Sequence, residues 1–358
     1  MAKKSIKGFS LFLVVVFILL SASFFGIDRS LLLTASAATP SAKAASPYQD
    51  LKLYPGGMPF GVKFVTAGVL VVGFTDVSSG VNPASASGLR CNDLILGIDS
   101  VPLSSAAELN ERIEQSGGKT LALRYSRNGA EHQTTLTPVW SDAEQRYVSG
   151  MYVRDSGAGI GTVTFIFPES LAFAGLGHGI CDGETGELIP MQRGSVVGVT
   201  ISGVVKGLSG TPGEVKGYFS SGKTGTLLGN THCGVFGVLV ALPEKLPCDP
   251  LPLGLRNEVK EGKAYIYCAL DSATNERYEI EISDIHRDST SNKCFTVKVT
   301  DPRLLSKTGG IIQGMSGSPI IQNGKLVGAV THVLINDPTT GYGIFIENML
   351  NQIGDLAG

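Results

Sequence analysis

Charged side chains are scarce in this sequence of 358 residues: they make up 17%, and the net charge is only −2. A typical soluble domain carries roughly 25% charged residues, and the 43% hydrophobic content here excludes a disordered chain. Because no basic excess is available to neutralise phosphates, we expect no nucleic-acid partner. The sequence has a single apolar run near the ~20 residues of a membrane helix, which excludes a polytopic membrane protein.

Paired metal-ligand motifs are also missing. No C-x-x-C pair occurs, and neither His178 near Cys181 nor His232 beside Cys233 has a second ligand pair at zinc spacing. We therefore expect no metal. The wide spacing of the six cysteines favours mostly buried free thiols, although export would permit disulfides. Gly217–Thr224 fits the P-loop expression, but a β-like run follows it where a helix is needed, so we interpret it as a turn.

Glycine, by contrast, is abundant, with 46 residues against 17 prolines and no G-X-Y period, which excludes collagen. Short runs rich in Val, Ile and Thr alternate with glycine turns and predict a mainly β protein. The length predicts two domains, at ~100–200 residues each.

The N-terminus resembles a targeting segment. Three lysines precede the apolar run Phe9–Phe25, and a small-x-small site follows at Ala35–Ala37. A basic, apolar and small-residue order of this kind is typical of an export signal, and the long apolar run equally fits a membrane anchor. We assign residues 1–38 to this signal or anchor, and residues 39–54 to a linker.

Residues 55–139 predict a first domain of α+β type. Strands are expected over 60–66 and 69–74, Ser105–Glu108 is a capping box that opens a helix, and Asn128-Gly129 marks a hairpin. This order is similar to a PDZ domain of the bacterial protease-associated type, a likeness carried by the stretch Gly88–Asp99.

A peptide-binding loop is expected near the start of this domain. Phe60, Gly61 and Val62 follow Pro59 and resemble the carboxylate-binding loop of PDZ domains. Such a loop offers backbone N–H groups to a peptide C-terminus, while the neighbouring strand pairs with the peptide. The alternative is an ordinary glycine turn.

Residues 150–358 predict a second domain of many short strands, which indicates a barrel or sandwich. The segment Gly314–Pro319 and the two strands expected after it resemble the nucleophile loop of chymotrypsin-like serine peptidases. Ser316 is the candidate nucleophile. The glycine at 314 lets its own N–H and that of Ser316 converge as an oxyanion hole.

A serine nucleophile needs a histidine base. His178 lies in a glycine-rich stretch that would expose its ring, and it is the favoured candidate. His232 precedes a cysteine as in chymotrypsin and is a rival. His332 is expected to be a wall of the site. His132 falls in the first domain, and His286 lies among charged residues.

The carboxylate that would orient the base is the least determined member. Asp301 begins a loop before Ser316, and the order His178, Asp301, Ser316 is that of chymotrypsin-type enzymes. Asp182 could instead hold the loop beside His178. From the residues alone the choice stays open among five aspartates: Asp182, Asp271, Asp284, Asp288 and Asp301.

Together, the N-terminal apolar segment, the PDZ-like domain and the two glycine-flanked motifs resemble the SpoIVB peptidase family of endospore-forming bacteria. HtrA-type proteases place the peptidase first, whereas here the PDZ domain comes first. The resemblance implies a PDZ domain followed by a chymotrypsin-like β-barrel serine peptidase, with a triad of His178, Asp301 and Ser316 and no cofactor.

The same resemblance implies a role in sporulation signalling. Members are exported into the space between the two forespore membranes, where they cleave a membrane-bound regulator and so allow an intramembrane protease to process pro-sigma-K. They also cleave themselves near the N-terminus, and their PDZ domain takes part in self-recognition and substrate targeting. The alternative is a catalytically inactive PDZ scaffold in the same compartment.

Overall fold

The computed structural model describes residues 46–77, 80–271 and 275–354. The predicted signal or anchor over 1–38 and the first part of the predicted linker lie outside these residues. Among the described residues, no helix is long and apolar enough to span a membrane. The described chain is mainly β, which confirms the predicted fold class.

Six strands close into a first barrel, because β2 pairs with β11 on one side and with β9 on the other. Around the barrel they are β2 (Pro59–Phe74), β9 (Met151–Ile166), β10 (Ala172–Gly175), β13 (Gly234–Leu239), β12 (Glu214–Thr231) and β11 (Met191–Val205). Phe60, Phe173 and Val235 fill its interior. Two short strands, β1 (Lys52–Pro55) and β14 (Leu251–Pro252), extend the sheet from β9.

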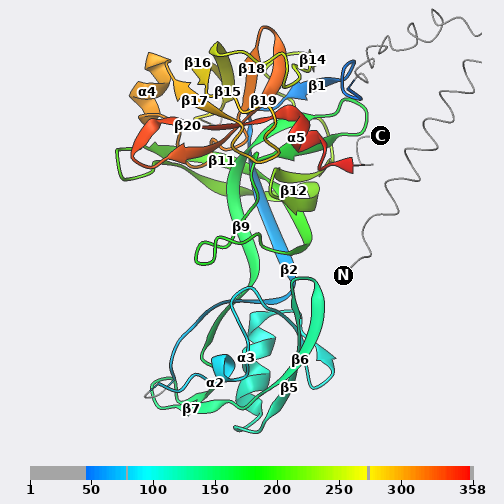
Figure 1. Cartoon of the computed structure of the whole chain (residues 1–358), viewed down its shortest axis with the longest axis vertical. Coiled ribbons are helices and arrows are strands. Elements are labelled where there is room, and N and C mark those ends of the chain that lie inside the picture. The colour runs from blue at the N-terminus through cyan, green and yellow to red at the C-terminus, as the bar shows by residue number, and fades with distance from the viewer. Residues whose placement is uncertain (1–45, 78–79, 272–274, 355–358) are drawn as a thin grey trace, which may run out of the picture. The chain divides into compact units, whose positions relative to one another are not determined.

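The PDZ domain is built on the far ends of the same two long strands (Figure 1). Its elements are α2 (Pro83–Ala86), β3 (Leu94–Ile98), β4 (Val101–Pro102), α3 (Ala106–Gln115), β5 (Leu121–Arg127) and β6 (Ala130–Leu136), followed by the hairpin of β7 (Val139–Ser141) and β8 (Arg146–Val148). The predicted capping box and hairpin are confirmed: the Ser105 hydroxyl accepts the Glu108 N–H, and β5 pairs with β6 across Asn128-Gly129.

The predicted break between the first two strands of this region is wrong. The strands expected over 60–66 and 69–74 form one continuous strand, β2, with a register shift against β9 between Val65 and Leu70. The first part of β2 pairs within the barrel, and Val69 and Leu70 pair with β3 of the PDZ domain. A single strand therefore serves both domains.

The predicted carboxylate-binding loop is also corrected. Phe60, Gly61 and Val62 lie inside β2, and Gly61 and Val62 are paired with β9 on one side and β11 on the other. Phe60 and Val62 are buried in the barrel core. Backbone groups that bond both neighbouring strands are not available to a peptide carboxylate, so these three residues are barrel residues.

A second closed barrel forms from six later strands. In order around the barrel they are β15 (Gly262–Cys268), β16 (Glu276–Ser283), β17 (Phe295–Val299), β20 (Asp337–Phe345), β19 (Lys325–Leu334) and β18 (Pro319–Gln322). The helices α4 (Pro302–Thr308) and α5 (Ile346–Leu350) accompany them. Tyr278, Phe295 and Phe345 are fully buried in the core of this half.

Hydrogen bonds from β9 join the two barrels. The Thr162 hydroxyl donates to the Gly314 carbonyl at 2.7 Å, and the Thr162 N–H donates to the Ser316 carbonyl at 3.0 Å. The Thr164 hydroxyl donates to the Gly317 carbonyl at 2.8 Å in a fully buried position. The loop before β18 is therefore held by a strand of the other barrel.

Replacing Thr164 by valine tests this joint. The change keeps the shape but leaves the buried Gly317 carbonyl without its donor, so we expect a loss of about 1–3 kcal/mol in the free energy of unfolding. The matched control is Thr200→Val on β11, where the hydroxyl is exposed and 3.5 Å from its nearest partner, Ser220. Urea unfolding of both variants measures the difference, and equal effects would contradict the role of Thr164.

Candidate active site

A cavity of about 460 Å³ lies where the two barrels meet. The first barrel contributes His178 with the loop around it, and the second contributes Gly314, Ser316 and His332. The structure therefore brings the predicted nucleophile and the favoured base into one cavity, although they are far apart in the sequence.

The loop that carries Ser316 depends on a close approach to β9. Gly317 has a φ of +95°, and a Cβ at this position would lie 2.1 Å from the Thr162 carbonyl oxygen. Only glycine fits both conditions, which explains the residue after the candidate nucleophile. The Ser316 hydroxyl donates to the Thr331 carbonyl at 2.7 Å, so it is fixed at the cavity wall.

Two backbone N–H groups remain open beside Ser316. Within the described chain, the N–H groups of Gly314 and Ser316 have no hydrogen-bond partner, whereas that of Gly317 donates to the Val330 carbonyl. Gly314 and Ser316 both line the cavity. A pair of unused donors at this place is what an oxyanion hole requires.

His178 is held by its own loop. Its Nδ1 lies 2.9 Å from the Gly179 carbonyl oxygen, and a carbonyl accepts only from a protonated nitrogen, so Nε2 is the free base position. Gly177, at a φ of +69°, brings the loop against β19, since a Cβ there would lie 2.9 Å from the Thr331 methyl group. Burial lowers the pKa of His178 below its ordinary 6.5, although the Gly179 carbonyl opposes this shift. The imidazole is therefore neutral near pH 7.

A second histidine packs against the first. The rings of His178 and His332 have centroids 4.7 Å apart and are tilted by 37°. Burial, with smaller effects of His178 and Lys293, lowers the pKa of His332 to about 4, so this ring is also neutral near pH 7. His332 lines the cavity as the wall expected from its position.

The other histidines lie elsewhere. His232 is exposed after β12, and His286 is exposed after β16. His132 stacks on Tyr125 within the PDZ domain. None of these three lines the cavity. His232 is therefore excluded as the rival candidate for the base.

Asp301 does not join His178 and Ser316 in the cavity. It is the N-cap of α4, and its carboxylate accepts from the backbone N–H groups of Arg303 and Glu279 and from the Arg303 guanidinium. The hydrogen bond from Arg303, with the backbone donors, lowers the pKa of Asp301 to about 2. The geometry thus corrects the expected triad, because a carboxylate used in this way stabilises α4 and not the imidazole.

Asp182 holds the loop beside His178, as its position suggested. Its carboxylate accepts the N–H groups of Glu184 and Thr185 and forms an ion pair with Arg154. No carboxylate side chain lines the cavity among the described residues.

The structure also places two other features of the sequence, the P-loop-like segment and the cysteines. Gly217–Thr224, which matches the P-loop expression, lies inside β12 and is not followed by a helix. All six cysteines are free, but only Cys233, Cys268 and Cys294 are buried, fewer than expected.

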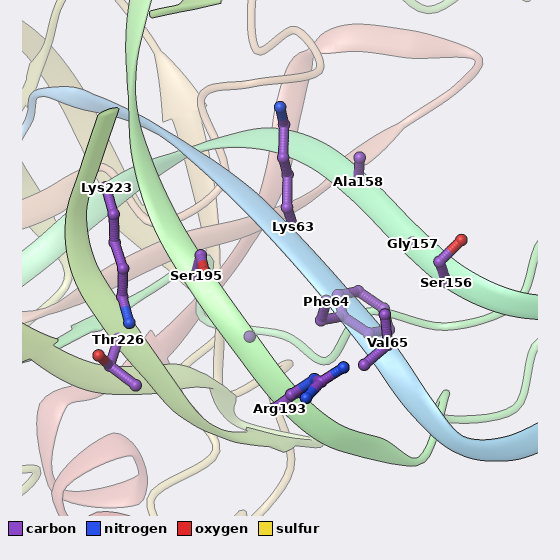
Figure 2. Close-up of a pocket in the computed structure, with 11 residues that line it drawn as sticks. Lys63, Phe64, Val65, Ser156, Gly157, Ala158, Arg193, Ser195, Lys223 and Thr226 are labelled. Carbon is purple, nitrogen blue, oxygen red and sulfur yellow. The ribbon is translucent and has the colours of Figure 1, made fainter. Parts of the chain in front are cut away.

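A separate cavity of about 640 Å³ lies on the face of β2, β9, β11 and β12. Figure 2 shows its three cationic side chains, Lys63, Arg193 and Lys223, with the Lys63 amine directed away from the other two. Lys63 instead lies over the Phe219 ring. The lining includes serine hydroxyls but no histidine or carboxylate, so it offers no base for nucleophilic catalysis.

Comparison with known families matches most of the described chain. Residues 145–350, more than half of the sequence, match the SpoIVB peptidase S55 model, and residues 56–137 match a PDZ domain model. Comparison with the curated proteins finds no significant match.

Several solved structures match parts of this chain. The PDZ domain of the SdrC-like protein from Listeria monocytogenes is 23% identical, with a TM-score of 0.22, over 24% of this chain and 87% of that one. The HtrA-type protease AlgW with tripeptide is 14% identical, with a TM-score of 0.33, over 56% of each chain. The Rv3671c protease from M. tuberculosis is 17% identical, with a TM-score of 0.29, over 56% of this chain and 74% of that one.

A PDZ domain and two barrels that enclose a serine loop and a histidine define a serine endopeptidase. Such an enzyme binds peptide or protein substrates. The chain belongs to the SpoIVB peptidase family S55, as its motifs indicated.

Asp301→Asn tests the corrected assignment. Asparagine also caps helices, so we expect activity per folded molecule to change less than tenfold, whereas a triad aspartate replaced by asparagine costs about 10⁴-fold in kcat. The depressed pKa means that the charge of Asp301 stabilises the fold above the ordinary pKa of 3.8, and that this contribution is lost as pH falls through about 2. The wild-type free energy of unfolding should therefore fall as the pH drops through this range, and that of the Asp301→Asn variant should not show this part of the fall.

Active-site titration with a serine-directed reagent normalises the rates to folded enzyme, and acid unfolding curves measure the stability. A loss of 10³-fold or more in the normalised kcat would return Asp301 to the catalytic machinery.

Proposed function

We propose that this chain cleaves peptide bonds with Ser316 as the nucleophile and His178 as the general base. The observation that carries the proposal is the shared cavity in which the serine, the imidazole and two unused N–H donors meet. Each of the three components that acyl transfer needs is supplied by this chain alone, so no cofactor is required.

The reaction begins when the Ser316 hydroxyl leaves the Thr331 carbonyl and turns towards Nε2 of His178. The imidazole takes the proton as the serine oxygen attacks the substrate carbonyl carbon. The N–H groups of Gly314 and Ser316 stabilise the oxyanion that forms. His178 then gives the proton to the leaving amine, and water releases the acyl group by the same steps.

In this proposal a backbone carbonyl takes the place of the aspartate that completes a Ser-His-Asp triad. In a Ser-His-Asp triad the aspartate fixes the tautomer of the histidine. Here the Gly179 carbonyl holds Nδ1, and the His332 ring limits the rotation of His178. A carbonyl has less charge than a carboxylate and stabilises the imidazolium less, so the base is weak, but its tautomer leaves Nε2 free to accept a proton.

In the cell, we propose that the chain is exported and acts between the forespore membranes in sporulation signalling, anchored until it cleaves itself. Its substrates would be a membrane-bound regulator of the protease that processes pro-sigma-K, and its own N-terminal region. The family membership and the PDZ domain support this role. The PDZ domain would present peptide C-termini, at a surface other than Phe60–Val62.

The alternative is an inactive scaffold, which the bond between Ser316 and the Thr331 carbonyl would favour if it persisted. A fluorophosphonate reagent separates the two, because only a serine activated by a base reacts rapidly. Labelling confined to Ser316 supports the enzyme.

Ser316→Ala should lower kcat/KM by about 10⁴-fold or more and abolish self-processing. The matched control is Ser318→Ala, because the buried Ser318 hydroxyl has no hydrogen-bond partner in the described structure. N-terminal sequencing of the mature chains measures processing. Complete self-processing by Ser316→Ala would exclude Ser316 as the nucleophile.

The pH profile tests the base. Because burial lowers the pKa of His178, the acidic limb of kcat/KM should have its midpoint below 6.5, and activity should fall as pH drops through that midpoint and the ring gains a proton. Ser318→Ala should keep the same limb. A midpoint above 6.5 would contradict a buried, neutral base.

A further inference from the structure

We propose that the cleft accepts a peptide whose side chain on the acyl side of the cleaved bond is apolar and uncharged. This inference rests on the proposed function, because it places the cleaved bond at Ser316. It goes beyond that function because it names the substrate class from the walls of the cavity.

The apolar walls lie directly beside the candidate nucleophile. Ile311 and Ile312 come just before Gly314, and Val333 and Ile335 come just after Thr331, whose carbonyl holds the Ser316 hydroxyl. A substrate carbonyl bound at the N–H groups of Gly314 and Ser316 has its own side chain next to these walls. This part of the cavity is therefore the pocket that selects the residue before the cleaved bond.

The cavity walls that the structure describes lack fixed charge. Among the described residues the lining contains no Asp, Glu, Lys or Arg, and its two histidines are neutral near pH 7 because of their lowered pKa values. Polar groups are limited to a few uncharged side chains, such as Gln313, and to backbone atoms. A lysine or aspartate buried here would have no ionic partner, so it would bind poorly unless the group lost its charge.

Exposed apolar surface borders the same cavity. Ile335, at the turn between β19 and β20, lines the cavity and is 56% exposed. A bound apolar side chain would cover part of this surface. Because the burial of apolar surface is favourable, leucine should be favoured over alanine.

The test uses purified full-length chain and a set of peptidyl diphenyl phosphonates that differ only in the residue at phosphorus: Leu, Ala, Lys or Asp. The Ser316 oxygen displaces phenol, so mass spectrometry of the labelled peptide gives the rate for each residue without the need for turnover. We expect the leucine reagent to react at least 100-fold faster than the lysine or aspartate reagent, and about 10- to 60-fold faster than the alanine reagent, depending on how many of its three extra carbons are buried.

Two variants make the test specific to the pocket. Ile335→Asp should raise the rate of the lysine reagent relative to leucine by about tenfold or more, because it supplies a carboxylate at the rim. The matched control is Leu228→Asp on β12, where an exposed aliphatic residue lies outside this cavity, and it should leave the ranking unchanged.

The outcomes separate the two proposals. If a fluorophosphonate fails to label Ser316, the proposed function is wrong. If it labels Ser316 but the lysine or aspartate reagent reacts as fast as leucine, or no peptidyl reagent reacts, the proposed specificity alone is overturned.

Discussion

The contact between β9 and the loop of residues 314–317 is the constraint on which the rest of the site depends. Thr162 and Thr164 use two hydroxyls and one N–H to hold three carbonyl groups of that loop: those of Gly314, Ser316 and Gly317. The N–H groups of Gly314 and Ser316 belong to the neighbouring peptide units, and within the described chain they are without a partner at the cavity. The bonds that join the barrels therefore hold the backbone on either side of the candidate oxyanion donors. A strand of one barrel therefore sets the chemistry of a loop in the other.

Local patterns in the sequence were sufficient for the class of the protein. The nucleophile loop, the glycine-flanked histidine and the helix cap at Ser105 each act within a few residues, and short-range chemistry of this kind is visible in a sequence. Pairing between strands that are far apart in the sequence is not visible in this way. The sequence could not show that Gly61 is enclosed between β9 and β11, because a glycine between apolar residues fits a binding loop and a barrel strand equally well.

Asp301 shows a second limit of prediction from the sequence. Its order before Ser316 fits a triad, but its spacing to Arg303 and the proline at 302 fit a helix cap equally well, and only the fold decides between them. The neighbouring guanidinium and the Glu279 N–H are supplied by the adjacent helix and strand, so the carboxylate is already satisfied before any histidine could compete for it. Chain order gives the sequence of the groups but not the direction in which each side chain points.

The absence of carboxylates from the lining links the base to the substrate. A nearby aspartate would stabilise the imidazolium, but its charge would also attract cationic side chains into the cleft. With the Gly179 carbonyl at Nδ1 and a neutral His332 beside the ring, the base is oriented without a fixed charge in the cavity. The candidate active site thus shares the scarcity of charge of the whole sequence. The arrangement that weakens the base also makes the cleft suitable for apolar segments of a protein substrate.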